Sequence, residues 1–128
     1  MKIEHAAWNV PDPNACARWY VEHLGFTIKK KFVDPPYGHF LADDSGTVMI
    51  ELYCRTDAAV PDYPNQHPGV THLAMVSKDV EADVARLVKA GGKLWNKVDY
   101  QPNGDILAFV QDPWGFTLQF VKRAQPLI

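Results

Sequence analysis

The sequence lacks the features that mark several classes of protein. It has no excess of charge of one sign, because 13 lysine and arginine residues stand against 15 aspartate and glutamate residues, for a net charge of −2. Binding to nucleic-acid phosphates needs a concentrated basic face, so we expect no nucleic acid partner. No run approaches the roughly 18 apolar residues that a membrane helix requires, so we also expect no membrane partner.

Cysteine is scarce as well. Cys16 and Cys54 are too few for a disulfide framework, and they lack the paired spacing of a zinc site. Residues 1–5 contain one lysine with no apolar stretch behind it, which is unlike a signal peptide. We therefore expect a cytoplasmic protein with reduced thiols. At 128 residues and 47% hydrophobic content, the chain is long and apolar enough for one domain with a core of its own.

The chain contains an internal repeat. Two short strand-like runs, residues 3–10 and 70–76, each have a histidine near the start. Each run leads into a segment with the spacing of apolar residues that is typical of a helix. Each helical segment begins after an aspartate that can accept a hydrogen bond from the first turn, and it ends at glycine. The aspartates are Asp12 and Asp79, and the glycines are Gly25 and Gly91–Gly92.

Three strand candidates follow each helix, separated by turns that contain proline and glycine. The sequence therefore predicts an α+β fold of two βαβββ modules, which form a curved mixed sheet with the helices on its outer face. Module 1 spans about residues 1–54 and module 2 about residues 70–123, and the proline-rich residues 55–69 link them. Neither module has much core alone, so we expect one domain over residues 1–128. The expected strands after the helices are 26–33, 38–43 and 47–54, then 93–98, 105–111 and 116–122.

Alternation of side chains assigns each residue of a strand to one face of the sheet. In residues 47–54, Ile50 and Leu52 lie on a wholly apolar face with Val48 and Cys54, which should pack under a helix. Glu51 points to the opposite, front face. The other polar residues that this reasoning places at the front are His5, His72 and Gln119. If the modules are related by a pseudo-twofold axis, these four side chains converge, and they are a reasonable set of ligands for a divalent metal.

The neighbours of Glu51 complete the expected cavity. Met49 and Tyr53 share its face, so we expect them to line a substrate pocket. Phe109 and Gln111 are further pocket candidates on a strand whose alternation the sequence does not fix. Gln119 has two interpretations, because it either binds the metal or is a polar residue of a pocket that holds none. A lone histidine is more often a hydrogen-bonded structural residue, and the repeat-related pair with Glu51 favours metal binding.

These features resemble the vicinal oxygen chelate superfamily, which includes glyoxalase I, methylmalonyl-CoA epimerase, fosfomycin- and bleomycin-resistance proteins and extradiol dioxygenases. The resemblance covers essentially the whole chain, and its most specific parts are residues 112–119, DPWGFTLQ, and residues 69–74, GVTHLA. It implies one vicinal-oxygen-chelate domain whose sheet encloses a cavity, and a homodimer with sites near the interface. The metal ligands that the resemblance implies are His5, Glu51, His72 and Gln119.

The sequence departs from that family at three positions. The fourth ligand is usually glutamate, whereas Gln119 can bind metal through its oxygen but cannot act as a general base. This leaves Glu51 as the expected catalytic base. Glyoxalase I has an arginine four residues after the first ligand and an asparagine four residues after the second, and here Asn9 and Arg55 stand there in the reverse order. We expect both in the substrate pocket, without glutathione as an implied substrate carrier.

The resemblance implies a glyoxalase-like metalloenzyme with lyase or isomerase activity. A small substrate would bind one divalent ion (Zn, Ni, Co, Mn or Fe) through two neighbouring oxygens. The ion would act as a Lewis acid that stabilises an enediolate or similar oxyanion, with Glu51 moving the proton. Two alternatives stay open. One is an iron(II) dioxygenase, because two histidines and a carboxylate form its usual triad. The other is a metal-free protein of the bleomycin-resistance type that sequesters a drug or metabolite.

Overall fold

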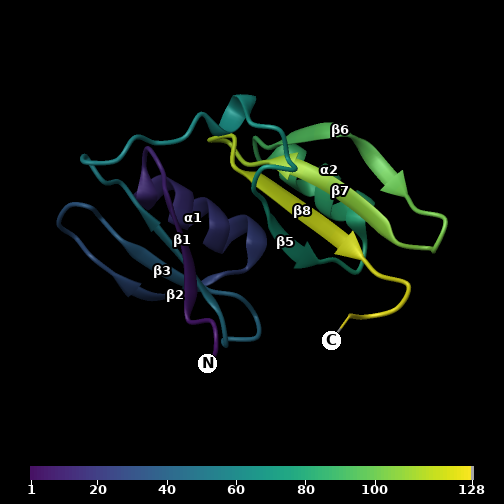
Figure 1. The fold of residues 1–128 in the computed structure, drawn as a ribbon, viewed down its shortest axis with the longest axis horizontal. Helices are drawn as coiled ribbons and strands as arrows, with labels where there is room; N and C mark the ends of the chain where they lie inside the picture. The colour runs from purple at the N-terminus through teal and green to yellow at the C-terminus, as the bar shows by residue number, and fades with distance from the viewer. Residues whose placement is uncertain (128) are drawn as a thin grey trace. The chain divides into compact units, whose positions relative to one another are not determined.

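The computed structural model describes residues 1–127, which divide into two compact units. The first unit ends at Pro61 and the second begins at Asp62, inside the predicted linker 55–69. Each unit holds one copy of the repeat and consists of one α-helix and a four-stranded mixed sheet (Figure 1). The predicted α+β fold of two βαβββ modules is therefore confirmed, with a separate sheet in each module.

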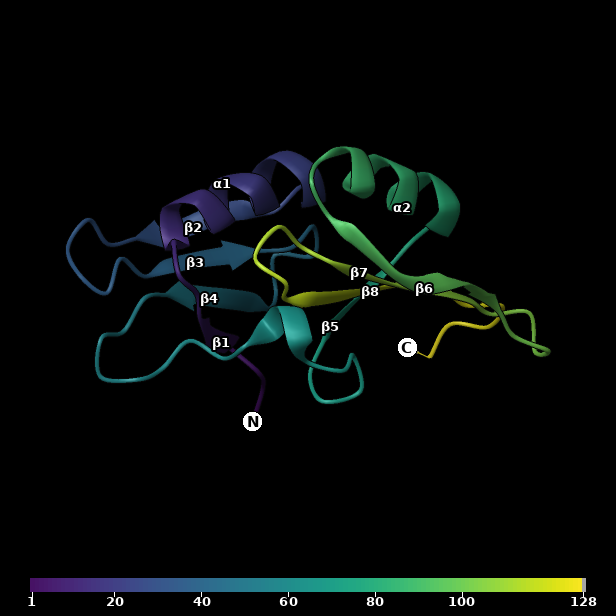
Figure 2. The ribbon, with the colours of Figure 1, turned by 90° about the horizontal axis from the view of Figure 1, so that it is seen from above.

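The first unit runs β1, α1, β2, β3, β4 along the chain. Its strands lie in the order β1-β4-β3-β2, with β1 parallel to β4 and the remaining pairs antiparallel. Figure 2 shows α1 lying along one face of this sheet, which leaves the other face for the predicted site residues. The elements are β1 (His5–Asn9), α1 (Pro13–Leu24), β2 (Thr27–Lys31), β3 (His39–Ala42) and β4 (Met49–Tyr53).

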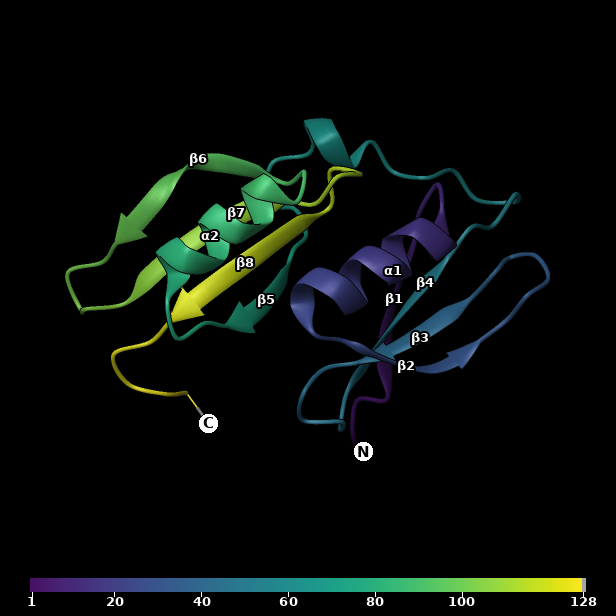
Figure 3. The ribbon, with the colours of Figure 1, turned by 180° about the vertical axis from the view of Figure 1, so that it is seen from behind.

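The second unit repeats this order after a short 3₁₀ helix, η1 (Tyr63–Asn65). Its strands lie in the order β5-β8-β7-β6, with β5 parallel to β8 and the other pairs antiparallel. From behind, Figure 3 shows α2 against one face of this second sheet. The elements are β5 (Leu73–Val76), α2 (Val80–Lys89), β6 (Lys93–Tyr100), β7 (Ile106–Gln111) and β8 (Thr117–Lys122).

Both helices begin where the sequence predicts. Asp12 accepts a hydrogen bond from the backbone N–H of Ala15 at 3.0 Å, and Asp79 accepts one from Ala82 at 3.0 Å. The first backbone N–H groups of a helix have no acceptor within the helix, and each aspartate supplies one. Gly25 ends α1 with a φ of 76°, a left-handed conformation that side chains disfavour.

The apolar faces predicted from alternation form the cores of the two units. Ile50 and Leu52 are buried in the first unit, as Leu118 and Phe120 are in the second. Val48, which we expected beside Ile50, is 39% exposed. It precedes the first residue of β4, and alternation holds only within the paired strand.

Cys16 and Cys54 are both free thiols, the first buried and the second half-buried. Among the helices of residues 1–127, none is long and apolar enough to cross a membrane.

Candidate metal and substrate site

The front face of the first sheet brings His5 and Glu51 together. Glu51 on β4 pairs in register with Ala7 of β1 and Phe40 of β3, so these side chains share a face. His5 lies two residues before Ala7, and its Nε2 is 3.5 Å from Oε2 of Glu51. The His5 ring also packs edge-on against Phe40, with centroids 5.3 Å apart. The side chains of His5 and Glu51 are 32% and 21% exposed, so a ligand can reach them.

The second ring nitrogen of His5 has a different partner. Nδ1 contacts the carboxylate of Glu4. A neutral imidazole carries one proton, so a hydrogen bond from Nδ1–H to Glu4 leaves the lone pair on Nε2, toward Glu51. A lone pair facing a carboxylate oxygen is repulsive unless a proton or a cation lies between them. A carboxylate behind the ring is also the outer contact that metal-binding histidines usually have.

The second sheet repeats this arrangement with different chemistry. Gln119 on β8 pairs in register with Ala74 of β5 and Phe109 of β7. His72 directly precedes β5, and its ring packs edge-on against Phe109 with centroids 5.3 Å apart. Its Nδ1 lies 2.9 Å from the carbonyl oxygen of Pro68, so Nδ1 carries the proton and Nε2 keeps its lone pair. Here too an oxygen occupies Nδ1 of the histidine and the ring contacts a phenylalanine of the front face.

Each unit thus places two of the four predicted ligands on one face. His5 and Glu51 approach each other directly, whereas His72 and Gln119 share the ring of Phe109 as a neighbour. Within residues 1–127, no three histidine, cysteine, aspartate or glutamate side chains form a group that could hold a metal ion.

The remaining predicted pocket residues of β4 lie as expected from alternation. Met49 pairs in register with His5, and Tyr53 pairs with Asn9. Both side chains are half-buried and share the face of Glu51.

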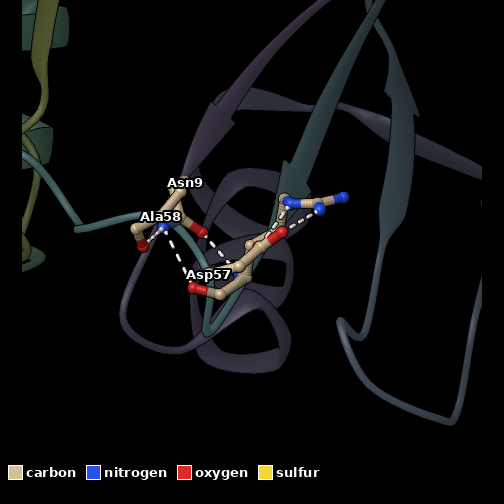
Figure 4. A network of polar contacts seen from close by, with 4 residues as sticks. Asn9, Asp57 and Ala58 are labelled. Carbon is tan, nitrogen blue, oxygen red and sulfur yellow. Dashed lines mark hydrogen bonds and ion pairs between the residues drawn. The ribbon is translucent and has the colours of Figure 1, made fainter.

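Asn9 has a structural role that sequence reasoning missed. Its Oδ1 accepts a hydrogen bond from the backbone N–H of Arg55 at 2.7 Å, and its Nδ2 donates to the carbonyl of Ala58 at 2.8 Å (Figure 4). The residue is only 7% exposed. Asn9 therefore fixes the segment that follows β4. No local pattern reveals this role, because the partners lie far along the chain.

Arg55 lies at a cavity, and its charge is already paired. Its Nε and Nη2 donate to the two carboxylate oxygens of Asp57 at 2.8 and 2.5 Å. These hydrogen bonds lower the pKa of the Asp57 carboxyl. Arg55 lines a cavity of about 350 Å³ together with Cys54 and two prolines, Pro35 and Pro36.

The two candidates on β7 prove to have different roles. Phe109 is on the front face beside His72, and it lines a second cavity of about 290 Å³. Gln111 is buried, and its Nε2 donates to the carbonyl of Pro64 at 3.1 Å, so it holds η1 in place. Trp95 of β6 pairs in register with Phe109 and lines the same cavity. Sequence reasoning missed Trp95, because the irregularity of β6 directly after it breaks the alternation.

Comparisons with known proteins agree with this architecture. The model of the Glyoxalase/Bleomycin resistance protein/Dioxygenase superfamily matches residues 2–120. A lactoylglutathione lyase of Haemophilus influenzae is 24% identical over 127 residues, which cover 96% of this chain and 93% of that protein. The crystal structure of a glyoxalase family protein from Bacillus cereus has a TM-score of 0.79 at 16% identity, covering 94% of this chain and 93% of the other. The crystal structure of an antibiotic binding protein from Streptomyces sp. CB03234 has a TM-score of 0.69 at 21% identity. The match covers 94% of this chain and 93% of that protein.

Proposed function

Because this chain belongs to the Glyoxalase/Bleomycin resistance protein/Dioxygenase superfamily, we propose that it is a metal-dependent lyase or isomerase of the glyoxalase type. Its substrate is a small molecule that binds one divalent ion through two neighbouring oxygens. One observation carries the proposal. The same histidine-on-phenylalanine arrangement occurs on both sheets, with Glu51 beside His5 and Gln119 on the face of His72.

The chemistry of the donors fits such an ion. Each histidine has its Nδ1 engaged by an oxygen, from the Glu4 carboxylate or the Pro68 carbonyl, so Nε2 is the available donor. Imidazole nitrogen and carboxylate oxygen together suit Zn, Ni, Co, Mn or Fe. When bound, the ion would supply Lewis-acid stabilisation of negative charge on the substrate oxygens. The proposed ligands are His5, Glu51, His72 and the amide oxygen of Gln119.

Glu51 is the proposed catalytic base. A histidine that binds metal uses its lone pair on the ion, and the Gln119 amide has no useful basicity near neutral pH. The Glu51 carboxylate alone among the four ligands can take a proton from the substrate and return it. The edge-on contacts with Phe40 and Phe109 hold the two imidazole rings in fixed orientations for this reaction.

The structure gives little support for a glutathione-carrying substrate. In glyoxalase I an arginine and an asparagine follow the first and second ligands, and here those places hold Asn9 and Arg55. The Asn9 amide is bonded to backbone groups of the first unit. The Arg55 guanidinium is paired with Asp57. The Asn9 amide is uncharged and the charge of Arg55 is paired with Asp57. Neither side chain therefore favours binding of a peptide carboxylate.

A second candidate function is small-molecule binding without a metal. Gln119 favours it, because an amide replaces the carboxylate usual at that position and gives a weaker ligand set. The antibiotic binding protein from Streptomyces is an example of a protein with this fold that binds a small molecule. In this case the front-face polar residues would hydrogen-bond the ligand directly.

We also propose that the protein is a homodimer. In the order β5-β8-β7-β6, β5 is an edge strand, and its Val76 is 89% exposed. Unpaired strand edges with exposed apolar residues favour association, most often with twofold symmetry. Light scattering at micromolar concentration should show twice the 14.4 kDa mass of one chain, and a 14.4 kDa species alone would count against the dimer.

Metal analysis of the purified protein tests the proposed function. A content near one zinc, nickel, cobalt or manganese per chain, with turnover that chelation abolishes and that metal restores, is the expected result. Iron that is lost on exposure to oxygen would indicate a dioxygenase instead. A protein that takes up none of these ions after incubation with each of them would be a binding protein.

A further inference from the structure

The second unit has a cavity of about 290 Å³ beside His72. Its apolar walls are Trp95, Leu107 and Phe109. Trp95 pairs in register with Phe109, and Leu107 lies two residues before Phe109 on β7, so the three side chains share the front face. Phe109 is both a wall of the cavity and the ring that supports His72. The cavity therefore adjoins one of the proposed metal ligands.

An irregularity in β6 accounts for this cavity. The register with β7 shifts between Trp95 and Asp99. Asn96 has a φ of 64°, a left-handed conformation that is uncommon for residues other than glycine. A bulge of this kind bends its strand and is often found next to binding sites. Asn96 and Lys97, which the bulge takes out of the ladder, line the cavity.

The first unit differs at the corresponding phenylalanine. Phe40 occupies the place of Phe109, because each supports the histidine of its own unit. Phe40 pairs in register with Lys30 of β2. The ring of Phe32 packs against the ring of Phe40, with centroids 6.5 Å apart. The Nζ of Lys30 lies 4.7 Å from the centroid of Phe32. In the first unit the ring of Phe32 packs against Phe40, whereas in the second unit the cavity lies beside Phe109.

The rim of the cavity is polar and rich in donors. Nδ1 of His67 accepts a hydrogen bond from the backbone N–H of Gly69 at 3.0 Å, so the neutral ring carries its proton on Nε2. The His67 ring packs edge-on against Trp95, with centroids 6.0 Å apart. Lys97 adds a cation. Asp99, the acidic residue of the rim, accepts a hydrogen bond from Nε2 of Gln101 at 2.5 Å.

We propose that this cavity binds the end of the substrate remote from the metal, and that this end is an aromatic ring. The proposal rests on the proposed function, because the metal would hold the two substrate oxygens beside His72. An apolar cavity of about 150 Å³ is large enough for benzene, so 290 Å³ accommodates a substituted ring, whereas a methyl group would leave most of it empty. Edge-on and stacked contacts with Trp95 and Phe109 favour a ring over an aliphatic group of similar size.

A comparison of mandelate with lactate tests the aromatic end of such a substrate while the oxygens that bind the metal stay the same. Both are 2-hydroxy acids with the same neighbouring oxygens, and they differ in a phenyl against a methyl group. In calorimetric titrations of the zinc-loaded protein, we expect mandelate to bind at least about 10-fold more tightly than lactate. Trp95→Ala should bring this ratio close to one and leave the affinities for lactate and zinc unchanged. Trp95→Phe should keep the ratio.

Phe32→Ala is the matched control, because it removes the ring that packs against Phe40 in the first unit. It should leave the mandelate-to-lactate ratio unchanged. Equal affinities of the wild-type protein for the two acids, or a ratio that survives Trp95→Ala, would overturn the aromatic subsite while zinc binding still supported the metal site.

If the protein binds no zinc, the proposed function fails and the cavity is tested alone. Phenylacetate is then titrated into the metal-free protein. Binding that Trp95→Ala abolishes and Phe32→Ala preserves supports an aromatic-binding cavity in a sequestration protein. Absence of binding by the wild-type protein overturns the inference.

Discussion

In the first unit the imidazole of His5 faces a carboxylate, whereas in the second unit the imidazole of His72 shares its face with an amide. Both rings pack edge-on against a phenylalanine at the same centroid separation of 5.3 Å. The scaffold is the same, and one functional group differs. Glu51 gives the first pair a negative charge and a base, while Gln119 keeps the second pair neutral. Under the proposed function, the repeat combines a half that carries the base with a half that binds without proton transfer.

The largest effect is expected from removing either histidine. His5→Ala and His72→Ala should each weaken the binding of a divalent ion by more than about 100-fold, because even contacts behind a ligand can contribute that much. Competition with a chromogenic chelator measures the change. His23→Ala, on α1 and not among the proposed ligands, is the control and should bind metal normally. If His72→Ala bound the metal with unchanged affinity, the first unit would bind the ion without the second.

Mixing the two variants shows whether one chain holds the whole ligand set. If the pairs that bind one ion come from different chains of a dimer, equimolar His5→Ala and His72→Ala proteins form mixed dimers with one intact site. Activity should then reappear after subunit exchange. If both pairs come from one chain, every site in the mixture lacks a histidine and activity stays absent.

Glu51→Gln gives the first unit the same functional group as the second. It should lower turnover of the hemithioacetal of phenylglyoxal and a small thiol by about 100- to 10,000-fold, the usual contribution of a general base. Metal binding should weaken, but less than in the histidine variants. Glu22→Gln, at an exposed position of α1, is the matched control. Wild-type turnover in Glu51→Gln would rule out Glu51 as the base.

Gln119→Glu makes the opposite change, and gives the second unit a carboxylate. If Gln119 is a ligand, metal should bind more tightly and activity on the hemithioacetal should increase. If the cavity binds small molecules without metal, the new half-buried charge has no counterion and should only lower the Tm. Thermal melts with and without the metal separate these outcomes.

In the second unit, the turn before β8 lies against the linker segment, where Gly115 approaches Pro64. Gly115 has a φ of 90°, and a Cβ there would lie 2.5 Å from the backbone nitrogen of Pro64. Gly115→Ala should therefore lower the free energy of unfolding by more than the roughly 1–3 kcal/mol that backbone strain alone costs. Gly46→Ala is the control, since its φ is 65° and no atom lies within 4 Å. Urea unfolding of both variants measures the difference, and equal losses would show that η1 moves aside freely.

The smallest expected effect concerns pH and the C-terminal segment of the second unit. Asp105 accepts hydrogen bonds from the backbone N–H of Ala124 at 2.9 Å and from Arg123 at 2.7 Å, and these lower the pKa of its carboxyl. The stabilisation is present above the unfolded pKa, about 3.9, and is lost as pH falls through the lower folded value. Asp105→Asn should therefore lower the Tm at pH 7, and the difference from wild type should shrink below about pH 4. A difference that does not depend on pH would contradict this origin.

The repeat made the fold predictable from sequence. Asp12, Asp79 and Gly25 mark helix ends through local chemistry, and alternation along β4 correctly placed Glu51 opposite Leu52. The features that sequence reasoning missed depend on contacts or backbone distortions that no local pattern encodes. Asn9 bonds to a segment far along the chain.

The cavity of the second unit shows the same limit. Trp95 lies directly before a bulge, and from that point strict alternation no longer assigns faces on β6. Phe109 was a candidate whose face the sequence left open, and the register with Gln119 resolves it. Sequence patterns therefore identified the polar residues of the front face, while the space beside them required the folded backbone.

Calorimetric titration of the metal-free protein with zinc tests the central claim most directly, which is that the two unlike halves serve one ion. The account predicts one ion per chain, and binding that is lost in His5→Ala and in His72→Ala alike. Two ions per chain, each lost in only one of the two variants, would contradict it, as would the absence of binding by the wild-type protein.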